Sequence, residues 1–380
     1  MHLPSWLSLL ALLATLPFAV LLFHGLRQLQ QLTDQPIDGA TPLLSIIIPA
    51  RNEAATIEPA LRSLLAADYP ALELIAVNDR SSDATGAILD RLAQEDSRLM
   101  VLHIEEIPAH WMGKSYALHL GAQRAQGEYL LFTDADIRFA PMTLRQAMAY
   151  TVEHKLDHLV VLPELQARSP LLRMLLVLFL ASFLLMFRPW LVRHDRRRFA
   201  GVGAFNLVRG AVYEVTGGHA AVAMTPLDDV LLGKRLKLAG ATTDVLLGTA
   251  AISVDWYPST LAMIRGLGKN GFAAFDYRLS KLVATTLLIV LVALWPLAGL
   301  FLGTPLARAA SALTLFLGAA SLYNLIRATD WPRWMLLLAP LATLISLFMC
   351  WRSALLALRH GTVGWRGTEY PLAELKARHF

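Results

Sequence analysis

The chain has 380 residues, of which 56% are hydrophobic and 17% are charged, and its formal net charge is +5. A water-soluble enzyme of this length needs more polar surface, so part of the apolar content is expected to face lipid. The single cysteine, Cys350, excludes an internal disulfide and a cysteine-based zinc site, and with them a disulfide-stapled secreted fold. Much of the positive charge lies beside apolar segments, which indicates anionic lipid head groups rather than a nucleic-acid partner.

The first predicted element is a transmembrane anchor over residues 1–26. Leu3–Phe23 carries no charged residue and has the roughly 20 residues that a helix needs to cross a bilayer. A cleaved signal peptide is the alternative, but no Lys or Arg precedes this stretch and no Ala-x-Ala site follows it. Because basic residues begin after the span, at Arg27, the N-terminus is expected outside and the next region in the cytoplasm.

A region of α/β type follows and is expected to cover residues 40–255. Short apolar runs typical of strands alternate with stretches of helical periodicity such as Asn52–Ala66 and Asp83–Ala93. The predicted strands are Leu44–Pro49, Glu73–Val77, Met100–Ile104, Tyr129–Thr133 and His158–Leu162. Alternation of this kind predicts βαβ units and a mostly parallel sheet, in which ligands bind at the carboxyl ends of the strands.

Polar clusters follow the first two predicted strands. They read Pro49-Ala50-Arg51-Asn52-Glu53 and Asn78-Asp79-Arg80-Ser81-Ser82-Asp83. Helix capping by Asn52 and Ser82 would explain either cluster alone. It does not explain why two successive strands both end this way, with Asp79 directly behind an apolar strand. A carboxylate at that place can accept a hydrogen bond from a uracil or guanine ring N–H.

A glycine–lysine pair, Gly113-Lys114, precedes a predicted amphipathic helix. Lys114 is either a solvated lysine of the first turn or part of an anion site. In the second case the backbone N–H groups of the helix N-terminus would bind the anion together with the ammonium group.

Two carboxylates one residue apart follow the fourth predicted strand, in Thr133-Asp134-Ala135-Asp136. Alternation along an extended chain would put Asp134 and Asp136 on the same side. Like charges held that close repel each other unless a cation lies between them, and Mg²⁺ or Mn²⁺ prefers such oxygen ligands. The motif therefore predicts a divalent metal site open to phosphate oxygens, with an Asp-rich turn as the alternative.

An apolar insert is expected within the α/β region, over residues 170–192. Its apolar core, Met174–Phe187, is bracketed by Arg173 and Arg188. This stretch is short for a membrane span, so it is expected to lie in the membrane interface or against the core.

Thr225-Pro226-Leu227-Asp228-Asp229 is predicted to open a helix. Thr225 as N-cap, Pro226 in the first turn and Asp228 three residues after Thr225 match a capping box. Asp228 would then have a structural role and Asp229 would not. Asp229 is therefore the candidate general base.

Arg265 and Lys269 stand four residues apart in a predicted helix, Ile264–Phe275, within a segment over 256–279 that is expected at the interface. These cations either meet lipid head groups or bind a diphosphate.

A transmembrane block is expected over residues 280–358, followed by a tail over 359–380. The predicted spans are Leu282–Gly303, Ala309–Ile326 and Met335–Trp351. Three spans after a cytoplasmic region would put the tail outside, whereas its basic residues favour the inside. One of the weaker segments lying in the interface would remove this conflict.

Taken in order, these motifs resemble those of the family-2 nucleotide-diphospho-sugar transferases with the GT-A fold. The matching pieces are Ser45–Glu53, Val77–Asp83, Gly113–Lys114, Thr133–Asp136, Gly217–Gly218 and Leu227–Asp229. The anchor, the apolar insert, the C-terminal helices and a late Trp365-x-Gly367-x-x-Tyr370 look most like the subgroup that glycosylates carotenoid or hopanoid lipids. The resemblance implies a nucleotide-sugar donor, a lipid acceptor, inversion at the sugar and a divalent metal, Mg²⁺ or Mn²⁺.

The resemblance also implies roles by position. Asp79 would contact the donor base, Asp136 would be the direct metal ligand, and Asp134 would contact the ribose or the metal. Asp229 would deprotonate the acceptor hydroxyl. The remaining residues that we expect to bind the donor are Pro49, Arg51, Glu53, Lys114, Arg265 and Lys269.

Two departures from the family pattern bear on function. Asn78 stands where many members carry Asp. The Gln-x-x-Arg-Trp motif of processive polymer synthases is absent, since Met263–Gly271 reads MIRGLGKNG. Its absence argues against polymer synthesis and leaves Arg265 and Lys269 as stand-ins for the diphosphate clamp.

The leading hypothesis is a multi-pass enzyme of the cell (inner) membrane that transfers one sugar to the hydroxyl or carboxyl of a lipid on the cytoplasmic face. A processive polysaccharide synthase is the second hypothesis. A catalytically silent lipid-binding or scaffold protein that retains the fold is the third.

Overall fold

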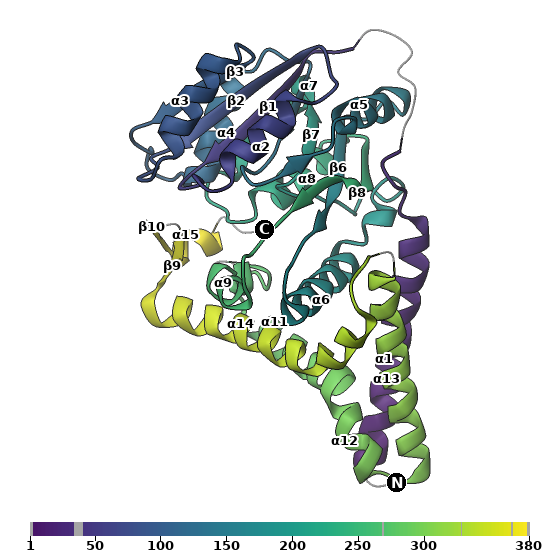
Figure 1. Ribbon diagram of the computed structural model, residues 1–380. Coiled ribbons are helices and arrows are strands. Elements are labelled where there is room, and N and C mark those ends of the chain that lie inside the picture. Colours follow the sequence, from purple (N-terminus) through teal and green to yellow (C-terminus); the bar gives the residue numbers. More distant parts are fainter. Residues whose placement is uncertain (1–2, 34–40, 268–269, 328, 366–367, 378–380) are drawn as a thin grey trace. The chain divides into compact units, whose positions relative to one another are not determined.

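The computed structural model describes residues 3–33, 41–267, 270–327, 329–365 and 368–377 (Figure 1). The chain forms two compact units, and each is described by itself. The sheet unit consists of Leu29–Gln166 and Pro189–Trp256. The helical unit consists of Met1–Gln28, Ala167–Arg188 and Tyr257–Phe380.

The described part of the sheet unit contains one eight-stranded sheet in the order β3-β2-β1-β4-β7-β6-β8-β5. The strands are β1 (Leu44–Ala50), β2 (Leu72–Asp79), β3 (Leu99–Ile104), β4 (Tyr129–Phe132), β5 (Arg138–Phe139), β6 (His158–Leu165), β7 (Asn206–Arg209) and β8 (Thr243–Val254). β7 runs antiparallel to β4 and β6, and β5 antiparallel to β8, whereas the other neighbouring pairs are parallel. The predicted mostly parallel sheet is confirmed.

Helices cover both faces of this sheet, so its central strands are buried on both sides. Ile46 and Ile48 of β1 belong to a core cluster that includes residues of three helices. These helices are α2 (Ile57–Leu65), α3 (Thr85–Glu95) and α5 (Thr143–Glu153). Ile47 points to the other face and packs in a second cluster with residues of α4 (Gly113–Arg124), α7 (Gly210–Val215) and α8 (Asp228–Leu238).

The order of the strands reverses direction at β1. The chain proceeds from β1 to β2 and β3 on one side and then returns to β4 on the other side of β1. Ligands of open α/β sheets bind at such a switch point, beyond the carboxyl ends of the strands. The ends of β1 and β4 carry two of the predicted motifs.

The first two helices begin later than predicted, and the predicted caps are wrong. α2 begins at Ile57 and α3 at Thr85, several residues after Asn52 and two after Asp83. Asn52 has a positive φ of 56°, and its Oδ1 accepts a hydrogen bond from the Ser82 N–H at 2.8 Å. The polar side chains therefore join the ends of β1 and β2 instead of capping helices.

Among the described residues, five helices are long and apolar enough to cross a membrane: Leu3–Gln28, Pro170–Leu191, Leu279–Leu302, Pro305–Ile326 and Arg333–His360. Two of them are the single helices α1 (Leu3–Gln28) and α13 (Pro305–Ile326). Two others include a 3₁₀ turn, which follows α6 (Pro170–Phe187) and precedes α14 (Ala339–His360). In the remaining one, α11 (Leu279–Ile289) continues into α12 (Trp295–Leu302). Each of the four predicted spans lies within one of these helices, and each helix is longer than the stretch that the sequence indicated.

The helix of the apolar insert begins before its predicted apolar core, Met174–Phe187. Ser169 caps α6 by accepting a hydrogen bond from the Leu172 N–H, and Pro170 occupies the first helical position. Together with the 3₁₀ turn, Pro170–Leu191 is therefore long and apolar enough to cross a membrane, unlike the shorter core indicated by the sequence. Nevertheless β6 precedes α6 while β7 and β8 follow it, and all three pair in one sheet. Both ends of α6 must lie on the same side of a membrane, so α6 cannot be a complete crossing.

Small and hydroxyl-bearing side chains hold α1, α12 and α13 together within the helical unit. Ser8 of α1 is buried and bonds to Ser311 of α13 at 2.9 Å. The indole N–H of Trp295 donates to the same Ser8 hydroxyl at 3.2 Å. A Cβ on Gly299 would overlap Ser311, so this glycine permits the close approach. Small interfacial residues with polar contacts are typical of packed transmembrane helices.

The predicted helix around Arg265 is two short helices, α9 (Thr260–Gly266) and α10 (Asn270–Ala273). Lys269 lies outside the described residues. Near the C-terminus, β9 (Thr362–Trp365) and β10 (Thr368–Pro371) form an antiparallel hairpin before α15 (Leu372–Ala377). Gly367 of the late motif also lies outside the described residues.

Candidate functional site

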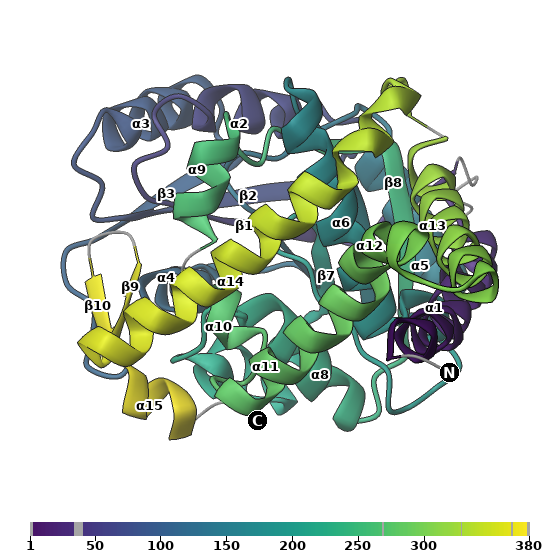
Figure 2. The same ribbon diagram turned by 90° about the horizontal axis from the view of Figure 1, so that it is seen from below.

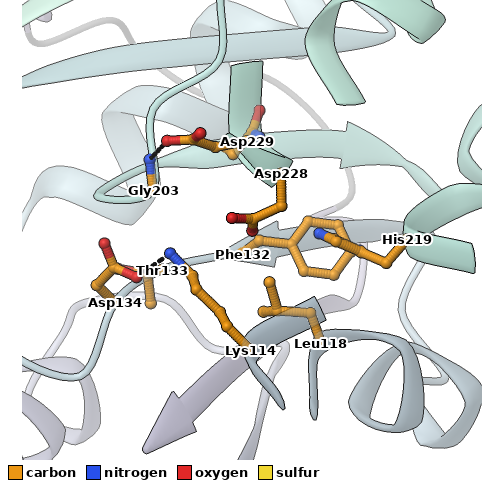
Figure 3. A pocket seen from close by; sticks show the side chains of 10 residues that line it. Lys114, Leu118, Phe132, Thr133, Asp134, Gly203, His219, Asp228 and Asp229 are labelled. Carbon is orange, nitrogen blue, oxygen red and sulfur yellow. Dashed lines mark hydrogen bonds and ion pairs between the residues drawn. The ribbon is translucent and has the colours of Figure 1, made fainter. Parts of the chain in front are cut away.

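A pocket with about 220 Å³ of empty space lies in the sheet unit (Figure 3). Its lining residues come from α4, the end of β4, β7, the loop before β7 and the start of α8. They are Lys114, Leu118, Phe132, Thr133, Asp134, Gly203, Asn206, His219, Asp228 and Asp229.

Lys114 is the cation of this pocket. Its Nζ forms an ion pair with Asp134 Oδ1 at 2.5 Å, drawn as a dashed line in Figure 3. Burial lowers the pKa of Lys114, but the carboxylates of Asp134, Asp228 and Asp229 outweigh this effect and raise it above the usual value. The lysine is therefore charged, and it lies in the first turn of α4 as predicted.

Asp134 and Asp136 lie in a turn rather than on an extended strand. β4 ends at Phe132, so the argument from strand alternation was wrong. The two carboxylates nevertheless repel each other electrostatically. Burial, together with repulsion by Asp134 and Glu53, raises the pKa of Asp136 to about 7. A bound divalent cation would relieve this repulsion, so the residues fit the predicted metal.

Asp79 is buried at the end of β2 and holds two arginines. Arg80 Nε donates to its Oδ1 at 2.9 Å, and Arg51 Nη1 lies 3.6 Å from its Oδ2. A Cβ on Gly113 would overlap the same carboxylate, so the glycine lets the N-terminus of α4 approach β2 closely. The polar ends of β1 and β2 and the predicted anion site are thus adjacent.

The other predicted residues of the first motif lie beside this arrangement. Pro49 is within β1 and pairs with Val77 of β2. Glu53 is fixed by its N–H, which donates to Thr85 Oγ1 at 2.8 Å, and by its Oε2, which accepts from Thr56 Oγ1 at 2.8 Å. Its negative charge acts on Asp136 across the switch point between β1 and β4.

The predicted capping box at the start of α8 is wrong. The helix begins at Asp228, and Thr225 Oγ1 accepts instead from the Leu227 N–H, in a turn before the helix. Asp228 is buried and lines the pocket, so it is not a capping residue. The prediction that Asp228 has a structural role and Asp229 does not is therefore no reason to prefer Asp229 as the base. Asp229 also lines the pocket.

Asp229 is oriented by the loop before β7. Its Oδ2 accepts from the Gly203 N–H at 2.7 Å, as Figure 3 shows, and its Oδ1 accepts from the Val230 N–H at 2.8 Å. Burial raises the pKa of Asp229 to about 6, and the neighbouring charge of Asp228 acts in the same direction. A carboxylate with a raised pKa is a better proton acceptor, as a general base requires.

Gly201 permits the contact between this loop and α8, and replacing it provides a test. A Cβ on Gly201 would overlap the backbone carbonyl of Asp229. Gly201→Ala is therefore expected to destabilise the protein by about 1–3 kcal/mol and to lower activity by displacing Asp229. Thermal unfolding and turnover measure the two effects. Gly318→Ala, within α13, is the control for turnover, since no atom lies within 4 Å of a Cβ there and its helical backbone accommodates alanine. Equal turnover in both variants would contradict the expectation.

Several pocket residues were not predicted from the sequence. Asp228 was assigned to capping, and Phe132, Gly203, Asn206 and His219 were not singled out. The Gly217-Gly218 pair was noted, and the histidine directly after it was the available signal. Arg265, which was predicted to bind the donor, belongs to the helical unit.

Comparison with known proteins places these features in a family. Residues 45–194 match the model of glycosyl transferase family 2. The chain is 33% identical over 112 residues to the putative teichuronic acid biosynthesis glycosyltransferase TuaG of Bacillus subtilis, a match that covers 30% of this chain and 43% of that protein. It is also 33% identical over 138 residues to the 4,4'-diaponeurosporenoate glycosyltransferase of Staphylococcus aureus. This match covers 36% of this chain and 35% of that protein. The matches thus span less than half the length of these relatives.

A solved structure shares the fold over almost the whole chain. It is a mannosyltransferase of Pyrobaculum calidifontis in complex with GDP-Man and Mn²⁺, which covers 92% of this chain and 99% of its own at a TM-score of 0.51 and 18% identity. Both the fold and the sequence matches agree with the resemblance carried by the motifs. Residues 45–194 are therefore similar to a family 2 glycosyltransferase domain, and the fold is GT-A-like.

Proposed function

We propose that the protein transfers one sugar from a UDP- or GDP-sugar to the hydroxyl or carboxyl of a lipid acceptor at the cytoplasmic face of the cell membrane. The observation that carries the proposal is a single pocket in which Lys114 lies among Asp134, Asp228 and Asp229. The part of the chain that the structure describes also contains five helices that are long and apolar enough to cross a membrane.

On the donor side, Asp136 and Asp134 would hold a divalent cation, which supplies positive charge against the diphosphate leaving group. In the described part of the chain no three His, Cys, Asp or Glu side chains form a metal site by themselves, so phosphate oxygens would complete the ligand set. The mannosyltransferase complex with GDP-Man and Mn²⁺ supports this choice of metal. Lys114 would bind the diphosphate, and Asp79 would accept a hydrogen bond from the donor base.

On the acceptor side, Asp229 would take the proton of the acceptor hydroxyl. The acceptor oxygen then forms a bond to the anomeric carbon while the bond from that carbon to the diphosphate breaks. Because attack and departure lie on opposite sides, the sugar inverts. The Gly203 N–H holds Asp229 Oδ2 in place, and burial together with the charge of Asp228 keeps the pKa of Asp229 high enough for proton uptake.

The lipid acceptor is supported by the helical unit and by the carotenoid named in one relative. α1 would anchor the protein, and the basic residues after it favour a cytoplasmic sheet unit. α6, which enters and leaves on one side, would lie in the interface, where an apolar acceptor is dissolved.

The experiment uses the full chain in lipid nanodiscs with a panel of UDP- and GDP-sugars, with Mn²⁺, Mg²⁺ or EDTA. We expect metal-dependent release of nucleoside diphosphate for at least one donor, and a glycolipid carrying one sugar by mass spectrometry. A long polymer as product would instead identify a processive synthase. Failure of every donor to bind in calorimetry with Mn²⁺ would favour the catalytically silent scaffold.

Lys114→Gln gives a separate test of the donor site. Removing the only cation among the pocket-lining residues is expected to lower turnover by roughly 10²-fold, since preorganised charges opposite a leaving group have effects of that size. Nucleoside diphosphate release at saturating acceptor measures it. Lys155→Gln, at an exposed lysine of the same unit, is the matched control. If both variants turn over like the wild type, Lys114 does not act on the diphosphate.

A further inference from the structure

His219 is a buried pocket residue to which the proposed reaction gives no role. It lies in the 3₁₀ helix η2 (Gly218–Val222), is 1% exposed, and lines the same pocket as Lys114. Its ring stands edge-on to Phe132 with the centroids 4.6 Å apart. Figure 3 shows this pair at one end of the pocket and Asp134 at the other.

Tyr213 determines which nitrogen of His219 carries the proton. The Tyr213 hydroxyl oxygen accepts from the His219 backbone N–H at 3.0 Å and lies 2.9 Å from the ring Nδ1. The hydroxyl is buried, and among the described residues Nδ1 is the acceptor available for its proton. Nδ1 therefore accepts, and the proton of the neutral imidazole is on Nε2.

The imidazole is uncharged at neutral pH. Burial lowers the pKa of His219 to about 3, and the positive charge of Lys114 acts in the same direction. A neutral ring is suited to an uncharged hydroxyl, while the anionic diphosphate is matched by Lys114.

The Nε2–H of His219 has no hydrogen-bond partner among the described residues, although the ring is almost fully buried. Buried polar groups are normally paired, and an unpaired one costs free energy. Since the other ring nitrogen is held by Tyr213 and the residue lines the pocket, the unpaired donor faces the space that a ligand would fill.

The backbone before His219 is built for this arrangement. Gly217 and Gly218 have φ values of +79° and +48°, in the left-handed region that favours glycine. A Cβ on Gly218 would overlap the ring of Tyr213. Both glycines thus allow the turn that packs His219 against Tyr213.

From this geometry we infer that His219 is a positioning residue whose Nε2–H donates a hydrogen bond to a hydroxyl group of the sugar being transferred. The inference rests on the proposed function. The aromatic ring of Phe132 beside His219 would pack against the apolar face of the same sugar ring. His219 would thereby contribute to the selection of the donor sugar. Lys114 and the carboxylates act on charged groups and do not provide this selectivity.

The test compares His219→Gln with His219→Met. The two side chains have nearly the same length and shape, but only Gln offers an N–H near the position of Nε2. We expect His219→Met to weaken binding of the turned-over nucleotide sugar by roughly three- to tenfold, the size of one hydrogen bond, and His219→Gln to restore most of it. Binding of the nucleoside diphosphate without sugar should be equal in wild type and both variants. Equal thermal unfolding of the pair controls for folding.

Deoxy analogues of the donor identify the hydroxyl. For one analogue, wild type and His219→Met should bind equally, because the group that His219 contacts is missing. Equal binding of the intact donor by wild type and His219→Met would overturn the inference, as would a loss confined to the lipid acceptor's KM. A protein that binds no nucleotide sugar at all would refute the proposed function instead, so the two failures are distinguishable.

Discussion

Asp229→Asn is expected to lower the rate of sugar transfer by roughly 10²–10⁴-fold, the usual contribution of a general base. The amide cannot take up the acceptor proton. Its oxygen can still accept from the Gly203 N–H, so the loop before β7 should keep its position. Single-turnover transfer to lipid measures the loss, and binding of the donor should remain within a few-fold of wild type.

The matched control is Asp90→Asn, at an exposed aspartate of α3. It should transfer sugar at the wild-type rate. If Asp229→Asn does the same while Asp228→Asn is inactive, the base is Asp228, whose carboxylate also lines the pocket.

The pH dependence of sugar transfer is an independent test of Asp229 as the general base. The base must be deprotonated to act, and the pKa of Asp229 is raised to about 6. Activity should therefore be full above this pH and fall about tenfold per unit as the pH drops further below it. A kcat/KM that is flat down to pH 4 would contradict the assignment. The acid limb should be absent from the residual activity of Asp229→Asn.

Asp136→Ala is expected to weaken Mn²⁺ binding, measured with nucleoside diphosphate present, by at least about 100-fold. Loss of a residue that only orients a metal ligand lowers metal affinity about 10–100-fold, and loss of a direct ligand lowers it more. Turnover should fall in parallel at fixed metal. Isothermal titration of Mn²⁺ gives the affinity, and Asp68→Ala, at an exposed aspartate, is the control.

The stability of the metal-free protein distinguishes a ligand from a structural residue. Without a cation, Asp136 is repelled by Asp134 and Glu53. Asp136→Ala should therefore unfold at the same temperature as wild type or higher in EDTA, and lower only when Mn²⁺ and nucleotide are present. A lower unfolding temperature in EDTA would indicate a structural role.

The class of fold, five of the eight strands in the sheet and the places of the main motifs could be predicted from the sequence. Buried strands such as Leu44–Ala50 are marked by local β-branched runs, and helices that cross a bilayer by about 20 apolar residues. Parallel strands put their carboxyl ends at one edge, so Asp79, Lys114, Asp134 and Asp136 could be expected near each other before any contact was known.

The hydrogen-bond partner of each polar side chain could not be predicted from the sequence and is known from the structure. Asn52 bonds to Ser82, 30 positions away, instead of capping a helix, and Asp229 is held by Gly203, 26 positions before it. Asp134 and Asp136 are in a turn fixed by the Gly203 carbonyl, which accepts from the Asp134 N–H. A polar side chain of this kind can form its hydrogen bond with a local or with a distant partner. The neighbouring residues in the sequence do not indicate which of the two it forms.

The position of α6 and the role of His219 follow the same reasoning. The helix that includes α6 is long enough for a span, whereas its apolar core in the sequence is short for one, and the pairing of β6 with β7 and β8 brings both of its ends to one side. A histidine after two glycines is uninformative by itself, whereas the Tyr213 hydroxyl fixes its tautomer and leaves one N–H for the pocket. Local periodicity fixes which elements form, and long-range hydrogen bonding and strand pairing fix what their polar residues can do.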